Sequence, residues 1–295
     1  MNWSFFVEVL LGGLLAGVMY SLVALGFVLI YKASGVLNFA QGAMVFLAAL
    51  VFVGLREKGA GLLVGVAVTL ALMIALAFLV ERIVLRPLVN QPQISLFMAT
   101  IGLAFLLEGT AQGVLGAQVH ALDLGIRDVP VKLGPIQISQ FDLFAAGCAA
   151  VLVTVLAVLF SKTRMGRALR AVADDHMAAL AVGIPLRQIW VVVWSAAGAV
   201  ALVAGLLWGS RIGVQFSLTL VTLKALPVLI IGGFTSVPGA IVGGLIVGAT
   251  EKLSEVYLGP HIGSGIENWA PYMLALLVLL VRPEGLFGER RIERV

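Results

Sequence analysis

Charged residues are scarce in this chain: Asp, Glu, Lys and Arg together make up 12% of its 295 residues. A soluble globular domain carries about 25% charged and about 45–50% apolar residues. Here 61% of the residues are hydrophobic, and the mean hydropathy is +1.11. These values exclude an ordinary soluble domain and predict an all-α, polytopic membrane protein. Since no charged or Pro/Ser-rich linker interrupts the apolar runs, residues 1–295 are expected to form a single transmembrane domain.

Sequence signatures of catalysis, metal binding and nucleotide binding are missing as well. His120, His176 and His261 lie in three separate loops without the spacing of metal ligands, and the lone Cys148 cannot form an internal disulfide. The chain contains no G-x-S-x-G, no H-E-x-x-H and no G-x-x-x-x-G-K followed by Ser or Thr. We therefore predict no catalytic residues, no metal site and no cofactor bound by this chain.

Nine apolar segments approach the length of about 20 residues that a helix needs to cross a membrane. They lie near 5–31, 38–55, 59–80, 94–116, 141–161, 190–208, 217–233, 238–256 and 265–281. Gly232, Gly233 and Pro238 break the helix between the seventh and eighth segments, which are either two spans or partly re-entrant. The predicted bundle therefore has about eight to ten spans and contains interrupted helices.

Basic residues gather beside these segments, which indicates membrane topology and not nucleic-acid binding. One face receives twelve of them and the other six: Lys32, Arg82, Arg86, Lys162, Arg164, Arg167, Arg170, Arg187, Arg282, Arg290, Arg291 and Arg294 against Arg56, Lys58, Arg127, Lys132, Arg211 and Lys252. Cytoplasmic loops carry the excess of Lys and Arg. We therefore expect the C-terminus in the cytoplasm and the N-terminus on the periplasmic side.

Glycines spaced four apart predict where helices pack closely, because such pairs share one helix face. The pairs are Gly13/Gly17, Gly61/Gly65, Gly109/Gly113, Gly205/Gly209, Gly239/Gly243 and Gly244/Gly248. Tight helix contact is a better explanation for them than a role in a translocation path.

Residues 161–189 form the longest charged passage and separate two long apolar runs. Alanines in its middle favour a short helix, which Gly183 and Pro185 are expected to end. Its charged side chains suit a protein surface, while Leu169, Val172, Leu180 and Val182 offer an apolar side. We interpret this loop as a docking element for a partner protein.

Four motifs resemble permease subunits of branched-chain amino acid ABC transporters. The run Gly166, Arg167, Arg170, Ala171, Asp174, Ala178, Ala179, Gly183 and Ile184 resembles the cytoplasmic coupling loop of that family, which contacts the ATPase subunit. NFAQG at 38–42, GGFTSVPGA at 232–240 and RPEGLFG at 282–288 fit the same family in the same order. The resemblance covers most of the chain. Asp175-His176 departs from the Asn-Pro of many members, which puts the local helix start in doubt.

The resemblance implies a permease subunit in the bacterial inner membrane. Its expected partners are two ATPase subunits that bind the ATP, a homologous second permease and an extracytoplasmic solute-binding protein. The residues expected to couple it to the ATPase are Gly166, Arg167, Arg170, Ala171, Asp174, Asp175, Gly183 and Ile184. Permeases for urea, short-chain amides or other amino acids look much alike, so the substrate stays open. A stand-alone secondary transporter or channel is the alternative from another class.

Polar residues within apolar segments are costly and indicate functional sites. Glu108 and Lys224 either line or gate an aqueous route, or lie near the outer boundary, where they reach water or pair for structure. Glu8, Glu81 and Lys32 lie at span ends and are expected to be interfacial anchors. Asn38, Gln41 and Gly42 open an apolar run and, in the resembling family, belong to a broken helix beside the translocation path. The alternative is a plain helix start with Asn38 as its N-cap.

The turn that contains Ser236, Pro238 and Gly239 cannot face lipid, because its freed backbone groups need partners. We place it at the cytoplasmic mouth, where the hydroxyls of Thr235 and Ser236 can accept hydrogen bonds from freed amides. It is either part of a surface that moves with the ATPase or an ordinary tight turn.

Overall fold

A computed structural model describes residues 3–88, 91–126, 128–174 and 176–288. These residues form two compact units. Unit 1 draws on residues 1–24, 125–151 and 222–295, and unit 2 on 25–124 and 152–221. Two long helices, α1 (Trp3–Ser34) and α5 (Gln140–Lys162), contribute residues to both units.

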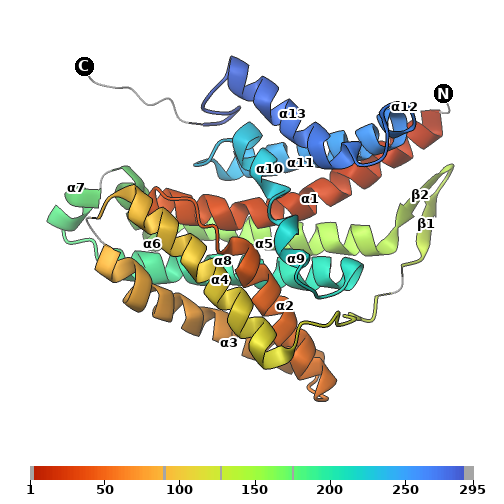
Figure 1. Ribbon diagram of the computed structural model, residues 1–295. Helices are drawn as coiled ribbons and strands as arrows, with labels where there is room; N and C mark the ends of the chain where they lie inside the picture. The colour runs from red at the N-terminus through yellow and green to blue at the C-terminus, as the bar shows by residue number, and fades with distance from the viewer. Residues whose placement is uncertain (1–2, 89–90, 127, 175, 289–295) are drawn as a thin grey trace. The chain divides into compact units, whose positions relative to one another are not determined.

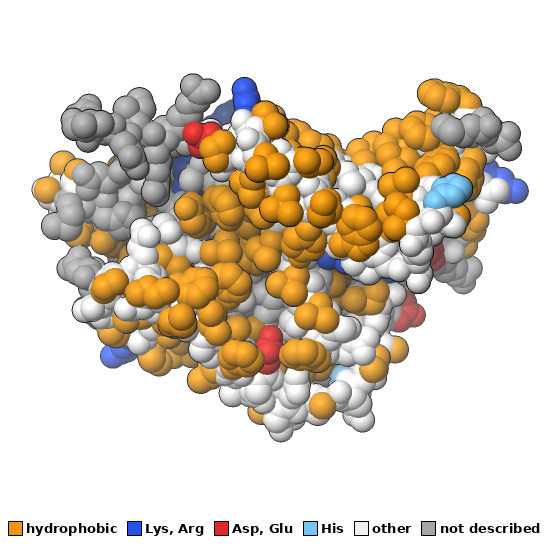
Figure 2. Space-filling model, turned by 45° about the horizontal axis from the view of Figure 1, so that its top comes forward, with side chains coloured by type: hydrophobic (Ala, Val, Ile, Leu, Met, Phe, Trp, Pro, Cys, Tyr) orange, Lys and Arg blue, Asp and Glu red, His pale blue; other side chains and the backbone are white. Residues whose placement is uncertain are grey.

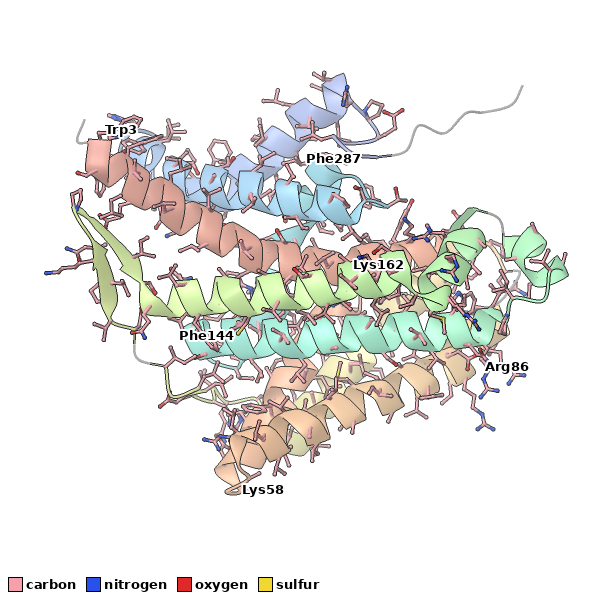
Figure 3. All side chains as sticks on the ribbon, turned by 180° about the vertical axis from the view of Figure 1, so that it is seen from behind. Trp3, Lys58, Arg86, Phe144, Lys162 and Phe287 are labelled. Carbon is pink, nitrogen blue, oxygen red and sulfur yellow. The ribbon has the colours of Figure 1, made fainter. Side chains whose placement is uncertain are left out.

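Unit 2 is built around α2 (Gln41–Glu57), which packs against α3 (Leu62–Val80), α4 (Gln93–Leu115), α8 (Leu186–Ile212) and the short α9 (Leu218–Val221). A π-helical turn η1 (Glu81–Leu85) and a 3-10 turn η2 (Arg86–Leu88) follow α3, and α6 (Arg164–Asp174) with α7 (His176–Ala181) precedes α8. Lys58 and Arg86 lie at opposite ends of α3 (Figure 3).

Unit 1 combines the N-terminal part of α1 with α10 (Ala225–Gly232), α11 (Val237–Leu253) and α13 (Ile266–Val281), which contact one another (Figure 1). The π-helical turn η3 (Ser254–Leu258) and α12 (Gly259–Ile262) connect α11 to α13. A β-hairpin, β1 (Pro130–Leu133) with β2 (Ile136–Ser139), precedes α5, with Pro130 opposite Ser139. The sequence did not predict this hairpin.

All nine predicted segments are helical, and the prediction of an α-helical membrane bundle with interrupted helices is confirmed. Within the described residues, five helices are long and apolar enough to span a membrane, and a pair bent by 117° raises the number to six. The predicted count of eight to ten was higher because α2, α11 and α13 are only 17, 17 and 16 residues long. Hydrophobic side chains predominate on the face in Figure 2.

Glycines hold α1 and α11 together in unit 1. A Cβ at Gly13 would lie 2.7 Å from the carbonyl oxygen of Gly248, and one at Gly17 would lie 2.5 Å from that of Gly244. The relation is reciprocal, since a Cβ at Gly244 would lie 2.6 Å from the Gly17 oxygen. The two predicted pairs therefore face each other, and their backbones touch where any side chain would keep them apart.

In unit 2 the predicted glycine pairs differ in their surroundings. A Cβ at Gly205 of α8 would lie 2.6 Å from the Val45 oxygen of α2, so this pair serves close packing as predicted. Gly109 and Gly113 of α4, by contrast, have nothing within 4 Å of an added Cβ. The packing prediction was wrong for these two within this chain, because spacing alone does not show which side of a helix is covered.

The glycine contact between α1 and α11 can be tested with one methyl group. Gly17→Ala is expected to lower the thermal unfolding midpoint of the purified protein in detergent, since overpacking costs about 1–3 kcal/mol. Gly113→Ala, whose methyl group meets open space, is expected to leave the midpoint unchanged or to raise it, because alanine favours a helix by up to about 1 kcal/mol. Equal midpoints for the two variants would contradict this packing.

Candidate functional site

The predicted docking loop is almost entirely helical. α5 runs to Lys162, and Thr163 then caps α6, its hydroxyl accepting a hydrogen bond from Gly166 N at 3.2 Å. Gly166 is buried against the Phe160 carbonyl, where a side chain would collide with the backbone. Arg170 donates from Nη1 to the same Phe160 oxygen at 3.0 Å. Gly166 and Arg170 therefore fix the corner between α5 and α6.

α7 ends as the sequence predicted. Gly183 adopts φ +82°, and Ile184 N donates to Ala179 O at 3.0 Å, which closes the helix end before Pro185 precedes α8. Of the predicted apolar side, Leu169 and Val172 are buried, whereas Leu180 and Val182 are 44% and 76% exposed.

The remaining predicted coupling residues lie on α6 or next to it. Arg167 is exposed and Ala171 is half-buried. Asp174 ends α6, and Asp175 lies outside the described residues. The end of α7 thus presents apolar side chains, with an exposed arginine on the neighbouring helix.

A buried carboxylate with a partner that the sequence did not indicate lies in the same unit. Glu81, 2% exposed, follows α3 and lies 3.6 Å from Nε of Arg187 at the start of α8. The prediction that Glu81 is an interfacial anchor was wrong, because its side chain is buried and pairs with Arg187 within the protein. This ion pair links the end of α3 to the helix that follows the docking loop.

The helix break between α1 and α2 is held by side chains. Gly35 adopts φ +70°, and Asn38, fully buried, accepts from Ala40 N at 3.1 Å through Oδ1. Phe39 N donates to Oγ1 of Thr100 on α4 at 3.3 Å. Ala40 and not Asn38 occupies the N-cap of α2, so the N-cap interpretation of Asn38 was wrong. Asn38 instead closes a local turn before the helix.

Gln41, the first residue of α2, is fully buried next to the equally buried Gly42. Its side chain lies against Gly26 of α1, where an added Cβ would come 2.7 Å from the Gln41 Cδ. Neither amide atom of Gln41 forms a hydrogen bond with a described residue. A buried amide without protein partners is costly, since a buried polar group needs hydrogen bonds.

Lys224 and Glu108 have different surroundings. Lys224 lies at the break before α10 and pairs with Glu251 of α11, with 2.7 Å between Nζ and Oε1. Tyr272 of α13 donates to Leu223 O in the same break at 2.8 Å. Glu108 lies within α4, half-buried, and takes part in no ion pair among the described residues. Glu251 was not among the predicted site residues, because nothing in its own segment indicates a partner 27 residues away.

The turn between α10 and α11 joins two of the sequence motifs. Ser236 caps α11 by accepting from Gly239 N at 3.0 Å, as predicted, and Pro238 lies in the first turn. The chain after α13 returns to the end of α10, where Leu286 N donates to Ile231 O at 2.8 Å and Phe287 N to Gly232 O at 3.2 Å. Residues 282–288 therefore satisfy carbonyl groups that the helix break leaves free.

The chain matches known transport proteins over nearly its whole length. The family model described as the permease component of branched-chain amino acid transport systems matches residues 9–282. The high-affinity branched-chain amino acid transport system permease protein LivH of Escherichia coli K12 is 30% identical over 100% of this chain and 99% of its own length. The corresponding permease BraD of Pseudomonas aeruginosa is 26% identical over 98% of each chain.

A solved structure shares the fold. PsaBC from Streptococcus pneumoniae in complex with Fab aligns with a TM-score of 0.50 over 94% of this chain and 93% of that chain, at 14% sequence identity. At this identity the likeness concerns the arrangement of helices alone.

The ion pair between Lys224 and Glu251 can be tested with a double-mutant cycle. Lys224→Met is expected to destabilise the protein by up to about 3 kcal/mol, because it leaves a buried carboxylate unpaired. Adding Glu251→Gln is expected to restore part of that loss. Lys252→Met removes an exposed pair of the same length, with Glu255, and is expected to cost less than about 1 kcal/mol. Additive effects of Lys224→Met and Glu251→Gln on thermal unfolding would contradict the coupling.

Proposed function

Since the chain belongs to the family of permease components of branched-chain amino acid transport systems, we propose that it is the membrane-spanning subunit of an ATP-driven importer for branched-chain amino acids. The observation that carries the proposal is the match to the family over residues 9–282 together with full-length similarity to LivH and BraD. The apolar helices agree with a multi-pass protein of the bacterial inner membrane.

The proposed partners follow from what the chain has and lacks. It carries no phosphate-binding loop, so the ATP is proposed to bind separate ATPase subunits. A homologous second permease would complete the pore, and an extracytoplasmic binding protein would deliver the solute. The positive-inside rule supports a cytoplasmic C-terminus and a periplasmic N-terminus.

We propose that the ATPase binds this chain at the end of α7. Leu180 and Val182 are exposed apolar residues beside a sharp stop at Gly183, and Arg167 adds a positive charge nearby in sequence. Arg170 and Gly166 serve this surface indirectly, because they hold the corner between α5 and α6. Movement of the ATPase would then be passed to α5 and α8, the helices that flank the loop.

For the path of the solute we propose the break between α1 and α2, with Asn38, Gln41 and Gly42. The buried amide of Gln41 supports this, because no described residue bonds to its hydrogen-bonding atoms, which leaves them for a passing polar solute. Glu108 and Lys224 stay candidates for lining or gating, although Lys224 is engaged with Glu251. The turn at Ser236, Pro238 and Gly239 is proposed to lie on the cytoplasmic side.

One observation favours the alternative of a stand-alone secondary transporter. Such a carrier needs paired ionisable groups within the membrane, and Lys224 with Glu251 is such a pair. Urea, short-chain amides and other amino acids are the alternative solutes for an ATP-driven importer.

Reconstitution distinguishes these functions. We expect the complex of this chain with its ATPase, second permease and binding protein to concentrate radiolabelled leucine in proteoliposomes only when ATP is supplied to the ATPase side. Isoleucine and valine should compete with leucine, and urea and acetamide should not. Concentrative uptake by this chain alone under a proton or sodium gradient would overturn the proposal in favour of the secondary transporter.

The docking surface yields a second test. Val182→Asp is expected to lower ATP-driven uptake and ATPase retention during purification at least tenfold, because a charge replaces an exposed apolar contact, while thermal unfolding of the chain stays unchanged. Val129→Asp is the matched control, since Val129 is 52% exposed beside the hairpin. Arg170 and Gly183 are less clean targets, because Arg170 bonds to Phe160 and Gly183 needs a positive φ. Normal uptake by Val182→Asp would contradict the assignment.

A further inference from the structure

Unit 2 contains a cavity of about 270 Å³ whose lining residues belong neither to the docking loop nor to the break between α1 and α2. Its walls are Phe46 of α2, Gln112 of α4, Ala117 and Gln118 after α4, and Gln215 and Phe216 after α8. Three of these six residues carry amide side chains and two carry phenyl rings. None of the described residues that line the cavity carries a charge.

The loop after α4 carries Gln118 and the loop after α8 carries Gln215, and these two loops are hydrogen-bonded to each other. α4 ends at Gly116, which adopts φ +92°, and the chain then forms a β-bridge in which His120 N donates to Val214 O at 3.0 Å and Val214 N to His120 O at 2.9 Å. Nδ1 of His120, a residue that is itself buried, lies 2.8 Å from Oε1 of Glu57 at the end of α2. The walls that hold Gln118 and Gln215 are therefore fixed before any solute arrives.

The cavity extends along the parallel helices α2 and α4. Phe39 and Phe97 make ring contact at the start of both helices, and a Cβ at Gly54 would lie 3.1 Å from Leu115 near their ends. Gln112 lies near the C-terminus of α4, whereas Phe46 lies only five residues after Gln41, about 7.5 Å along the helix axis at about 1.5 Å per residue. The cavity thus reaches from the loop end of the unit towards the level of the buried Gln41.

We propose that this cavity binds a zwitterionic aliphatic amino acid. An amide supplies both an acceptor for an ammonium group and a donor for a carboxylate, and it carries no net charge. Three amides can therefore hold a zwitterion, while Phe46 and Phe216 contact an apolar side chain. A solute with an additional charge would lose water without meeting a counter-charge, which is costly. The volume suits one small solute, being near the lower end of the range of about 300–1,000 Å³ for ligand pockets.

This inference rests on the proposed function for the choice of solute and deepens it by naming a site. Under the proposed orientation, the loops after α4 and α8 face the periplasm, so the cavity receives the solute when the binding protein releases it. The binding protein would select the solute first. The amides of Gln112, Gln118 and Gln215 would then select a net-neutral solute a second time, within the permease.

A thiol-protection experiment on the assembled complex tests the site directly. Cys148→Ala removes the native thiol, and Ala117→Cys introduces a reporter at the cavity wall without altering any of the three amides. In right-side-out vesicles we expect leucine at millimolar concentration to slow labelling by a membrane-impermeant maleimide at least threefold, and lysine or glutamate to have no such effect. Gln137→Cys, on the exposed hairpin, is expected to label at the same rate with and without leucine.

Three further variants test whether the amides are the binding groups. Gln112→Met and Gln215→Met keep the side-chain length but remove donor and acceptor, and each is expected to abolish protection by leucine in the Ala117→Cys background. Gln112→Glu is expected to make lysine protective, because it supplies the missing counter-charge.

The outcomes separate the inference from the proposed function. Four results would each overturn the site. They are failure of the Ala117→Cys reporter to label, equal labelling with and without leucine, equal protection by lysine and leucine in the unchanged cavity, and full protection in the methionine variants. Uptake of leucine by the unmodified complex is measured in parallel. Absence of ATP-driven uptake would overturn the proposed function, whereas uptake without thiol protection would overturn the cavity alone.

Discussion

The structure depends on one constraint: a backbone group freed by a helix break inside a membrane protein must find a partner within the protein. In the described part of the chain, three of the helix breaks are completed by one or two residues from a distant segment. Thr100 accepts from Phe39 N after α1, Tyr272 donates to Leu223 O before α10, and Leu286 with Phe287 donates to the end of α10. The breaks are therefore where segments far apart in sequence become bound to each other.

Glycine serves two purposes in this structure. At Gly17 and Gly244 the missing side chain lets two backbones touch, while at Gly183 and Gly233 it permits the positive φ that ends a helix. At Gly233 the two uses coincide, because an added Cβ there would lie 2.7 Å from Gly288 N. The breaks and close contacts together leave polar groups such as the amide of Gln41 inside the unit, where apolar packing alone would have excluded them.

Much of the fold could be predicted from the sequence, because long apolar segments and helix-breaking residues are local signals. The nine helical segments, the stop at Gly183 and the cap at Ser236 belong to this class. The candidate site was harder to predict from the sequence, because its main contacts join residues that are far apart in the chain. Glu81 was predicted to be a span-end residue, and its contact with Arg187 is visible only in the structure. Glu251 was not predicted at all, because its partner Lys224 lies in another segment. The bridge between His120 and Val214 has no signal in either segment alone.

The return of residues 286–287 to the end of α10 has a consequence for biogenesis. The ribosome makes α10 before α11, η3, α12 and α13. The amides of Leu286 and Phe287, which bond to the end of α10, are made after all of these helices. At a synthesis rate of about 5–20 residues per second, the end of α10 waits about 3–10 seconds for Leu286 and Phe287. During that interval water or the translocon must supply hydrogen bonds to those carbonyl groups, so folding of the final quarter of the chain is completed only once residues 286–287 have been made.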